Sequence, residues 1–230
     1  MTKQKAHFGR GLFEFLEELA RNNRREWFEE NRERYEREVR RPMLAFIADF
    51  GPHLKQISSK FVADPRPQGG SMFRIYRDVR FSPDKRPYKV HASARFRHVM
   101  ARDVHTPGYY LHLEPGNVFC GAGIWHPEPA TLNKIRDSIV KNSRPWKKCV
   151  DDPAMCERWE LKGDKLSRPP RGYDPEHPLI DDLKRKDFIA IANLKDADTL
   201  AASFIERFAE ICQTATPLMK FLTKALEIQF

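Results

Sequence analysis

The sequence predicts an α+β fold, in which a central, mainly antiparallel sheet of about four to six strands is flanked by N-terminal and C-terminal helices. Helical periodicity dominates residues 1–62, period-two alternation dominates residues 63–125, and helices return, with a Pro-rich loop, over residues 126–230. The predicted strands of the middle part follow one another without intervening helices, which argues against a doubly wound parallel sheet. A chain of 230 residues can bury a core of its own, so we expect one domain spanning 1–230.

Three helices are expected before the sheet. An apolar stripe at helical spacing over residues 13–20 predicts the first of them. Asn23 followed by Glu26 fits a capping box that opens the second, and Pro42 suits the first turn of the third. Arg and Glu alternate over residues 23–41 at i,i+3 and i,i+4 spacing, which is typical of a salt-bridged face in solvent.

The elements after residue 62 are predicted from alternation and from turn residues. A Pro- and Gly-rich loop occupies residues 63–70. Strands are expected over residues 72–78, 90–97, 108–114, 117–124 and 188–194. Helices are expected over about residues 128–141, 143–159, 196–212 and 215–228.

The turn Glu-Pro-Gly-Asn at residues 114–117 sets the register of two strands. His112 then faces Phe119, Tyr110 faces Gly121, and Gly108 faces Gly123. In this register the apolar side chains of both strands share one face, whereas a slip of one residue would mix the two faces.

Polar side chains collect on the opposite face of the predicted sheet. They are Arg74, Tyr76, Asp78, His91, Arg95, Arg97, Tyr110, His112 and Glu114. Gly121 and Gly123 leave floor space beside them, and glycines inside a strand often mark the close approach of a ligand. An ordinary solvated sheet face is the alternative interpretation. Asp78 and Asp84 have a local alternative as well, in which they pair with neighbouring Arg or Lys residues and hold a loop in shape.

The chemistry predicted for this face is anion binding. Residues 65–103 contain ten Lys or Arg against three Asp, which is +7 of the chain's net charge of +9. Arg guanidinium groups bind phosphate and carboxylate through paired hydrogen bonds. His112 and Glu114, two apart on one strand, are the candidate catalytic pair for acid–base work. We predict no metal and no cofactor, because a lone His-x-Glu supplies too few ligands for a divalent ion.

The Pro-rich segment 167–188 is expected to be an extended loop. In one interpretation Arg171, Tyr173 and His177 reach the polar face and bind the ligand with it. In the other interpretation these side chains only anchor the loop.

The apolar runs and the cysteines of the sequence predict the cellular location of the protein. The longest apolar run, residues 43–48, is far shorter than the roughly 20 residues that span a bilayer, so no membrane association is expected. The four cysteines form no Cys-x-x-Cys pair, which favours reduced thiols in a cytoplasmic protein. No secretory signal is visible at the start of the sequence.

Four segments in this order resemble the family catalogued as domain of unknown function 2461. They are NNRREWFEENRERYE, ADPRPQGGSMFRIYRDVRFSPDKRPYK, GYYLHLEPGNVFCGAGIW and RPPRGYDPEHPLIDDLKRKDF. The resemblance covers nearly the whole chain. It implies a soluble, intracellular protein of one domain, and it carries no activity or catalytic residues over to this sequence.

Three functions are compatible with the sequence. The first is binding of a small phosphorylated or carboxylated ligand, with or without turnover, on the polar face of the sheet. The second is a nucleic-acid-binding module that uses the same Arg and aromatic side chains as a platform. The third is a basic module that binds a partner protein without catalysis. The clustering of charge beside candidate acid–base groups favours the first function, and the sequence leaves the oligomeric state open.

Overall fold

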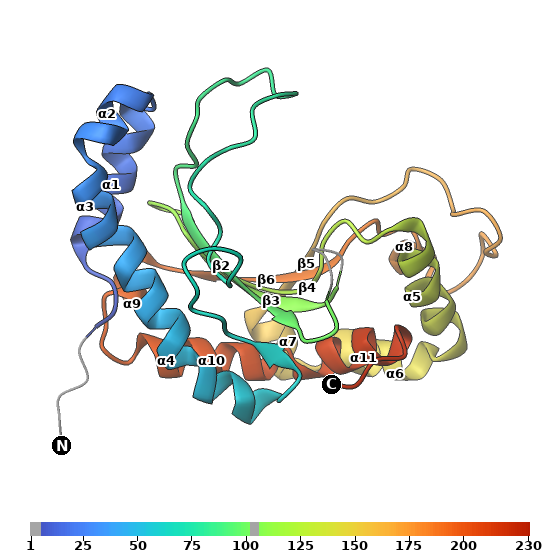
Figure 1. Ribbon diagram of the computed structural model, residues 1–230. Coiled ribbons are helices and arrows are strands. Elements are labelled where there is room, and N and C mark those ends of the chain that lie inside the picture. The colour runs from blue at the N-terminus through green and yellow to red at the C-terminus, as the bar shows by residue number, and fades with distance from the viewer. Residues whose placement is uncertain (1–5, 102–105) are drawn as a thin grey trace.

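The computed structural model describes residues 6–101 and 106–230. Within these residues, a six-stranded sheet has the order β1-β2-β3-β4-β6-β5, and every neighbouring pair is antiparallel (Figure 1). The strands are β1 (Phe61–Val62), β2 (Ala92–His98), β3 (Gly108–Leu113), β4 (Val118–Ile124), β5 (Glu160–Lys162) and β6 (Phe188–Leu194).

Helices precede and follow the strands. Those before the sheet are α1 (Arg10–Arg21), α2 (Arg25–Glu30), α3 (Arg32–Tyr35), the π-helical turn η1 (Glu36–Arg40) and α4 (Arg41–Ile57). Those after β4 are α5 (Pro129–Lys141), α6 (Ser143–Val150), α7 (Pro153–Arg158), α8 (Ile180–Leu183), α9 (Asp196–Thr199), α10 (Phe204–Thr214) and α11 (Thr216–Ala225). The α+β fold with flanking helices is therefore confirmed. No helix in the described ranges is long and apolar enough to cross a membrane.

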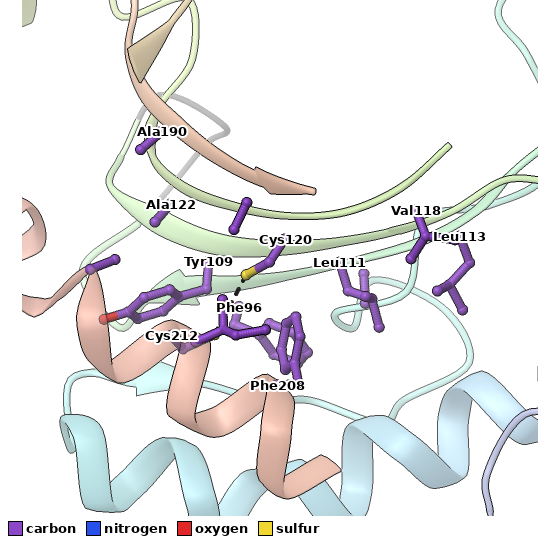
Figure 2. Packing of buried hydrophobic residues seen from close by; sticks show 14 of the residues in the cluster. Phe96, Tyr109, Leu111, Leu113, Val118, Cys120, Ala122, Ala190, Phe208 and Cys212 are labelled. Carbon is purple, nitrogen blue, oxygen red and sulfur yellow. Dashed lines mark hydrogen bonds between the residues drawn. The ribbon is translucent and has the colours of Figure 1, made fainter. Parts of the chain in front are cut away.

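The core lies between one face of the sheet and helices α4, α10 and α11, which run beneath the sheet in Figure 1. Figure 2 shows Phe96, Leu111 and Cys120 pointing from three neighbouring strands towards α10. The Sγ atoms of Cys120 and Cys212 are 3.7 Å apart in this layer. Removal of apolar surface from water is worth about 25 cal/mol per Å², so burial of this layer stabilises the fold.

The predicted register of β3 and β4 is confirmed. His112 pairs with Phe119, Tyr110 with Gly121, and Gly108 with Gly123. Side chains alternate between the two faces of each strand, so the residues named in these pairs all lie on the face opposite α10. Strand β6 extends that face beyond β4, and its bounds are those predicted for it.

The predicted strand 72–78 is wrong. Residues around Met72 form a single bridge to Ala94, and the chain then leaves the sheet as an arm, residues 75–89 (teal in Figure 1). A second isolated bridge, between Tyr76 and Tyr88, joins the two sides of the arm near its base.

Local hydrogen bonds explain why the arm leaves the sheet. The carboxylate of Asp78 accepts from the backbone N–H and the guanidinium of Arg80, and Asp84 does the same for Arg86. Side chains that bond their own backbone two residues on favour turns and compete with the strand ladder. The alternating pattern therefore belongs to a twisted arm and not to a central strand.

The predicted capping box at Asn23 is also wrong. Arg24 is the N-cap residue of α2, and it makes no side-chain capping bond. Asn23 instead bonds the backbone of Tyr88 at the base of the arm. The predicted helix 143–159 is divided because Pro153 starts a new helix, α7, whose first turn is capped by Asp152. The predicted helix 196–212 is likewise divided, into α9 and α10.

Candidate functional site

A pocket of about 540 Å³ lies on the face of the sheet that the core helices leave open. Its described lining comes from β2 and the residues just before it, from β3, β4 and β6, and from Phe73, Thr106 and Trp125. The side chains that line it from the strands and from two residues before β2 are Lys89, His91, Ser93, Arg95, Tyr110, His112, Phe119, Ile189 and Ile191, with Gly108, Gly121 and Gly123 between them.

A chain of hydrogen bonds crosses one side of the pocket. The Tyr110 hydroxyl lies 3.0 Å from Nδ1 of His112, and Nε2 of His112 lies 3.2 Å from Oε2 of Glu114. Asn117 donates its side-chain N–H to the same Glu114 oxygen at 2.7 Å. An ionised Glu114 only accepts, so we assign the His112 proton to Nε2 and let Nδ1 accept from Tyr110. Both ring nitrogens of His112 are therefore engaged.

Burial sets the charge of the two histidines. It lowers the pKa of His91 to about 4, with the neighbouring His112 and Lys89 acting in the same direction. It also lowers the pKa of His112, against the opposing effect of Glu114. Desolvation disfavours the charged form of a base, so both rings are neutral at pH 7. Their centroids lie 4.3 Å apart, and His112 stacks on Phe119 at 4.5 Å.

Tyr110 and Glu114, at the two ends of this hydrogen-bond chain, differ in their protonation at neutral pH. Burial raises the pKa of Tyr110, against a hydrogen bond from Ser93, so the phenol keeps its proton. Burial also acts to raise the pKa of Glu114, but hydrogen bonds from Asn117 and His112 outweigh it and lower the pKa. At neutral pH the hydrogen-bond chain thus consists of the neutral Tyr110 phenol, the neutral His112 imidazole and the ionised Glu114 carboxylate.

Lys89 and Arg95 supply the positive charge of the pocket. The Lys89 Nζ atom lies 5.2 Å from the centroid of the Phe73 ring, in cation–π range. Burial lowers the pKa of Lys89, and the neighbouring Arg74 lowers it further. Arg95 donates from Nη2 to the Thr106 carbonyl oxygen at 2.8 Å. No Asp or Glu appears among the described residues that line the pocket.

The structure brings together six of the residues predicted for the site. His91, Arg95, Tyr110, His112, Gly121 and Gly123 all line the pocket. Glu114 reaches it only through His112. The described lining does not include Arg74, Tyr76, Asp78 or Arg97.

The excluded side chains have other positions. Arg74 and Arg97 are exposed, and Tyr76 lies in the arm. Asp78 pairs with Arg80 at 2.7 Å, so it takes part in the local pairing that was the alternative interpretation. Asp84 pairs in the same way with Arg86, at 2.8 Å.

The Pro-rich loop contributes nothing to the described lining of the pocket. The Tyr173 hydroxyl donates to Asp137 on α5 at 2.8 Å. Nδ1 of His177 accepts from the backbone N–H of Leu179 at 3.1 Å, and Arg171 is exposed. The segment is not an extended loop throughout, because α8 forms part of it; in Figure 1 it lies beside α5, away from β2 and β3. Contacts of Tyr173 and His177 are those of loop anchors.

Several pocket residues were not predicted. Phe73 alternates with Arg74, which was expected on the polar face, so the predicted strand 72–78 would have turned Phe73 towards the core. Lys89 lies two residues before His91, so the alternation that places His91 on the polar face also predicts Lys89 there. Ile189 on β6 had a similar signal, because it alternates with buried residues of the same strand.

The two glycines of β4 have different causes. Gly123 has a φ of 123°, and a Cβ there would collide with the Phe188 carbonyl oxygen, so the backbone itself requires glycine. A Cβ on Gly121 would lie 3.3 Å from Cβ of Tyr110 and 3.7 Å from a methyl group of Ile191. Gly121 therefore keeps the floor of the pocket low.

The basic segment 65–103 is partly neutralised. Arg77, Arg80 and Arg86 all pair with the two Asp residues of the arm. Arg102 and Asp103, which entered the predicted charge of this segment, lie outside the described residues.

A family model described as "Conserved hypothetical protein (DUF2461)" matches residues 11–221. No curated protein matches the chain. The match covers the helices before the sheet, all the described strands and most of the C-terminal helices, including every residue of the pocket. The chain therefore belongs to the DUF2461 family of conserved hypothetical proteins.

Proposed function

We propose that the pocket on the open face of the sheet binds a small organic anion, a carboxylate or a phosphate ester with an apolar body. One observation carries the proposal: Lys89 lines the pocket, and no Asp or Glu does so among its described residues. The low pKa of His91 keeps that ring neutral, so Lys89 is the side chain that we expect to provide the charge that selects an anion. In a partly dry pocket such charge–charge contacts are stronger than in water.

The rest of the pocket lining is the reason for proposing that the ligand has an apolar body. Phe73, Phe119, Trp125 and Ile191 present rings and a branched chain to the same space. Trp125 is 59 % exposed, although large apolar side chains tend to be buried. A ligand that covered this ring would remove apolar surface from water and gain about 25 cal/mol per Å².

His112 and Glu114 are proposed as positioning residues for the Tyr110 hydroxyl. Both nitrogens of His112 are already bonded, and Glu114 is not part of the described lining. Their hydrogen bonds fix the direction of the phenol, which lines the pocket together with the His112 ring. If the bound ligand also reacts, the hydrogen bonds from Tyr110 through His112 to Glu114 are the route by which a proton leaves or reaches Tyr110.

A nucleic-acid or protein partner is the second candidate, and the tip of the arm favours it. Phe81 is 93 % exposed there, and the Arg80 guanidinium lies 5.8 Å from its ring centroid. Aromatic and Arg side chains together are the usual platform for single-stranded bases. The ion pairs of Arg77, Arg80 and Arg86 with Asp residues weaken this candidate, because those charges are already matched.

A cytoplasmic location fits the same proposal. The four cysteines are free, and Cys120 and Cys212 share a thiol–thiol hydrogen bond at 3.7 Å and no disulfide. Reduced thiols are typical of proteins in the cytosol.

Thermal denaturation in the presence of phenyllactate, phenyl phosphate, inorganic phosphate and a short oligonucleotide tests the proposal. A ligand at 100 times its dissociation constant stabilises by about 2.7 kcal/mol, or roughly 5–10 °C for a chain of this size. We expect an organic anion to raise the melting temperature of the wild type and of Lys55→Met, and to raise that of Lys89→Met by about half as much or less. Lys55 is exposed on α4, so its replacement removes the same charge outside the pocket. A rise with the oligonucleotide alone, lost at high salt, would favour the second candidate.

A further inference from the structure

We infer that Gly121 determines which apolar body the pocket accepts, and that this body is a flat aromatic ring and not a saturated one. The inference rests on the proposed function, because the ring belongs to the organic anion that Lys89 attracts.

The backbone accounts for two glycines of the pocket but not for Gly121. A Cβ on Gly123 would collide with the Phe188 carbonyl oxygen, and a Cβ on Gly108 would lie 2.9 Å from the Phe96 carbonyl oxygen. The three nearest neighbours of a Cβ on Gly121 are all side-chain atoms, at 3.3 Å or more. The fold therefore tolerates a side chain at position 121, and the lack of one leaves space inside the pocket.

The space above Gly121 is a narrow slot. Gly121 pairs with Tyr110 on β3 and with Ile191 on β6, so these two side chains form the walls of the slot. The Cδ1 atoms of Tyr110 and Ile191 both lie within 3.7 Å of the point that a Gly121 Cβ would occupy. Carbon atoms in contact stand about 3.5–4.0 Å apart, so a group one atom thick fills the slot with a contact on each side. A saturated ring is puckered and thicker, so it would have to push the two walls apart.

The length of the slot also suits one ring. Phe119 lies two residues before Gly121 on the same face of β4 and closes one end of the slot. Gly123 leaves the other end without a side chain. Positions 121 and 123 are about 7 Å apart along the strand, which is room for the edge of one six-membered ring.

The positive charge of Lys89 lies close to the slot. Its Nζ atom is 5.2 Å from the centroid of the Phe73 ring, and the centroid of the Tyr110 ring is 6.1 Å from the same point. Lys89 and the Tyr110 wall thus flank one phenyl ring, so a ligand with a short spacer reaches both. The ligand class is therefore an aryl group on a short chain that ends in a carboxylate or a phosphate.

Two acids with the same carbon skeleton test the inference. Phenyllactate carries a flat ring, and 3-cyclohexyllactate carries the saturated counterpart. Calorimetric titration into the full chain should show that phenyllactate binds at least about tenfold more tightly, a difference typical of overpacking. In an open cleft the cyclohexyl acid would bind equally well or better, because it has more apolar surface to remove from water.

Gly121→Ala places a methyl group at the base of the slot. It should weaken phenyllactate binding by at least about tenfold and bring the affinities of the two acids closer together. Gly9→Ala is the matched control, because Gly9 is exposed before α1 and a Cβ there meets nothing within 4 Å. This control should bind both acids as the wild type does.

The outcomes separate the two claims. If the wild type binds both acids equally, or binds the cyclohexyl acid more tightly, the inference is overturned and the proposed function stands. Unchanged phenyllactate affinity in folded Gly121→Ala would overturn it as well. If neither acid binds to the wild type, the proposed function itself fails. The comparison of the two acids on the wild type gives its answer even if Gly121→Ala does not fold.

Discussion

Asn23 and Tyr88, 65 positions apart in the chain, exchange two hydrogen bonds. The Asn23 side chain donates to the Tyr88 carbonyl oxygen at 2.9 Å and accepts from the Tyr88 backbone N–H at 3.0 Å. Phe28 of α2 stacks on the Tyr88 ring at 4.2 Å beside them. One amide side chain thus fastens the base of the arm to the N-terminal helices, next to Lys89 of the pocket.

Replacement of Asn23 by Ala should loosen this end of the arm. Loss of two hydrogen bonds to a buried segment should lower the free energy of unfolding by about 1–2 kcal/mol. Urea denaturation measures that loss, and faster hydrogen exchange at the Tyr88 amide locates it. Asn22→Ala is the matched control, because the Asn22 side chain donates to the Glu18 carbonyl oxygen at the end of α1 and does not contact the arm in the described hydrogen bonds. Equal exchange rates at Tyr88 in the wild type and in Asn23→Ala would contradict the role of this contact.

The two glycines of β4 should respond very differently to alanine. Gly123→Ala forces a Cβ into the Phe188 carbonyl at a positive φ, so it should cost about 3 kcal/mol or more. Gly121→Ala meets only side-chain atoms at van der Waals distance or slightly closer, and it should cost less than about 1 kcal/mol. Chemical denaturation of both variants checks the difference. Similar costs for the two would show that β4 does not approach β6 as described.

Stability should fall as the pH drops from about 6.5 towards 4. In this range the unfolded chain protonates His91 while the folded protein keeps it neutral, because its pKa is lowered to about 4. The unfolded state binds more protons, so the free energy of unfolding rises with pH. After allowance for the partial exposure of the ring, the effect should be about 1 kcal/mol.

The variant His91→Gln isolates this contribution. Its stability should vary less than that of the wild type between pH 6.5 and 4. Below about pH 4 both proteins should lose stability together, because carboxylates such as Asp78, whose pKa is lowered to about 2 by Arg80, become protonated. Parallel curves for the two proteins above pH 4 would count against a buried, neutral His91.

The influence of the Glu114 carboxylate should be measurable as a change in the pKa of His112. Glu114 acts to raise the pKa of His112, so Glu114→Gln should lower that pKa further. Titration of the imidazole signals by NMR measures the change. Glu128→Gln, an exposed position before α5, should leave the His112 titration unaltered. A rise in the His112 pKa in Glu114→Gln would refute the hydrogen-bond chain.

Alternation and turn chemistry were enough to predict β3, β4 and their register. The Pro-Gly turn fixes which residues face one another, and a slip by one residue would expose Leu111 and Cys120. The same register places Tyr110, His112 and Gly121 together on the open face, so this part of the pocket follows from the strand pattern alone. Strand β6 was predicted for a related reason, from its short apolar run.

The prediction of strands from period-two alternation failed where side chains hydrogen-bond the backbone of their own segment. The sequence around Asp78 alternates like a strand, yet its carboxylate turns the chain, and Phe73 instead of Arg74 enters the pocket. The partner of Asn23 was equally hidden, because an Asn that caps a helix and one that bonds a distant Tyr88 look alike in sequence.

Calorimetric titration of phenyllactate into the wild type and into Lys89→Met tests the anion site most directly. The account predicts one site per chain in the wild type, and binding weaker by about tenfold or more in Lys89→Met, which corresponds to about 1.4 kcal/mol or more. Lys55→Met should bind like the wild type. Absence of binding in the wild type, or equal affinities in all three proteins, would contradict the claim that this face of the sheet binds an organic anion through Lys89.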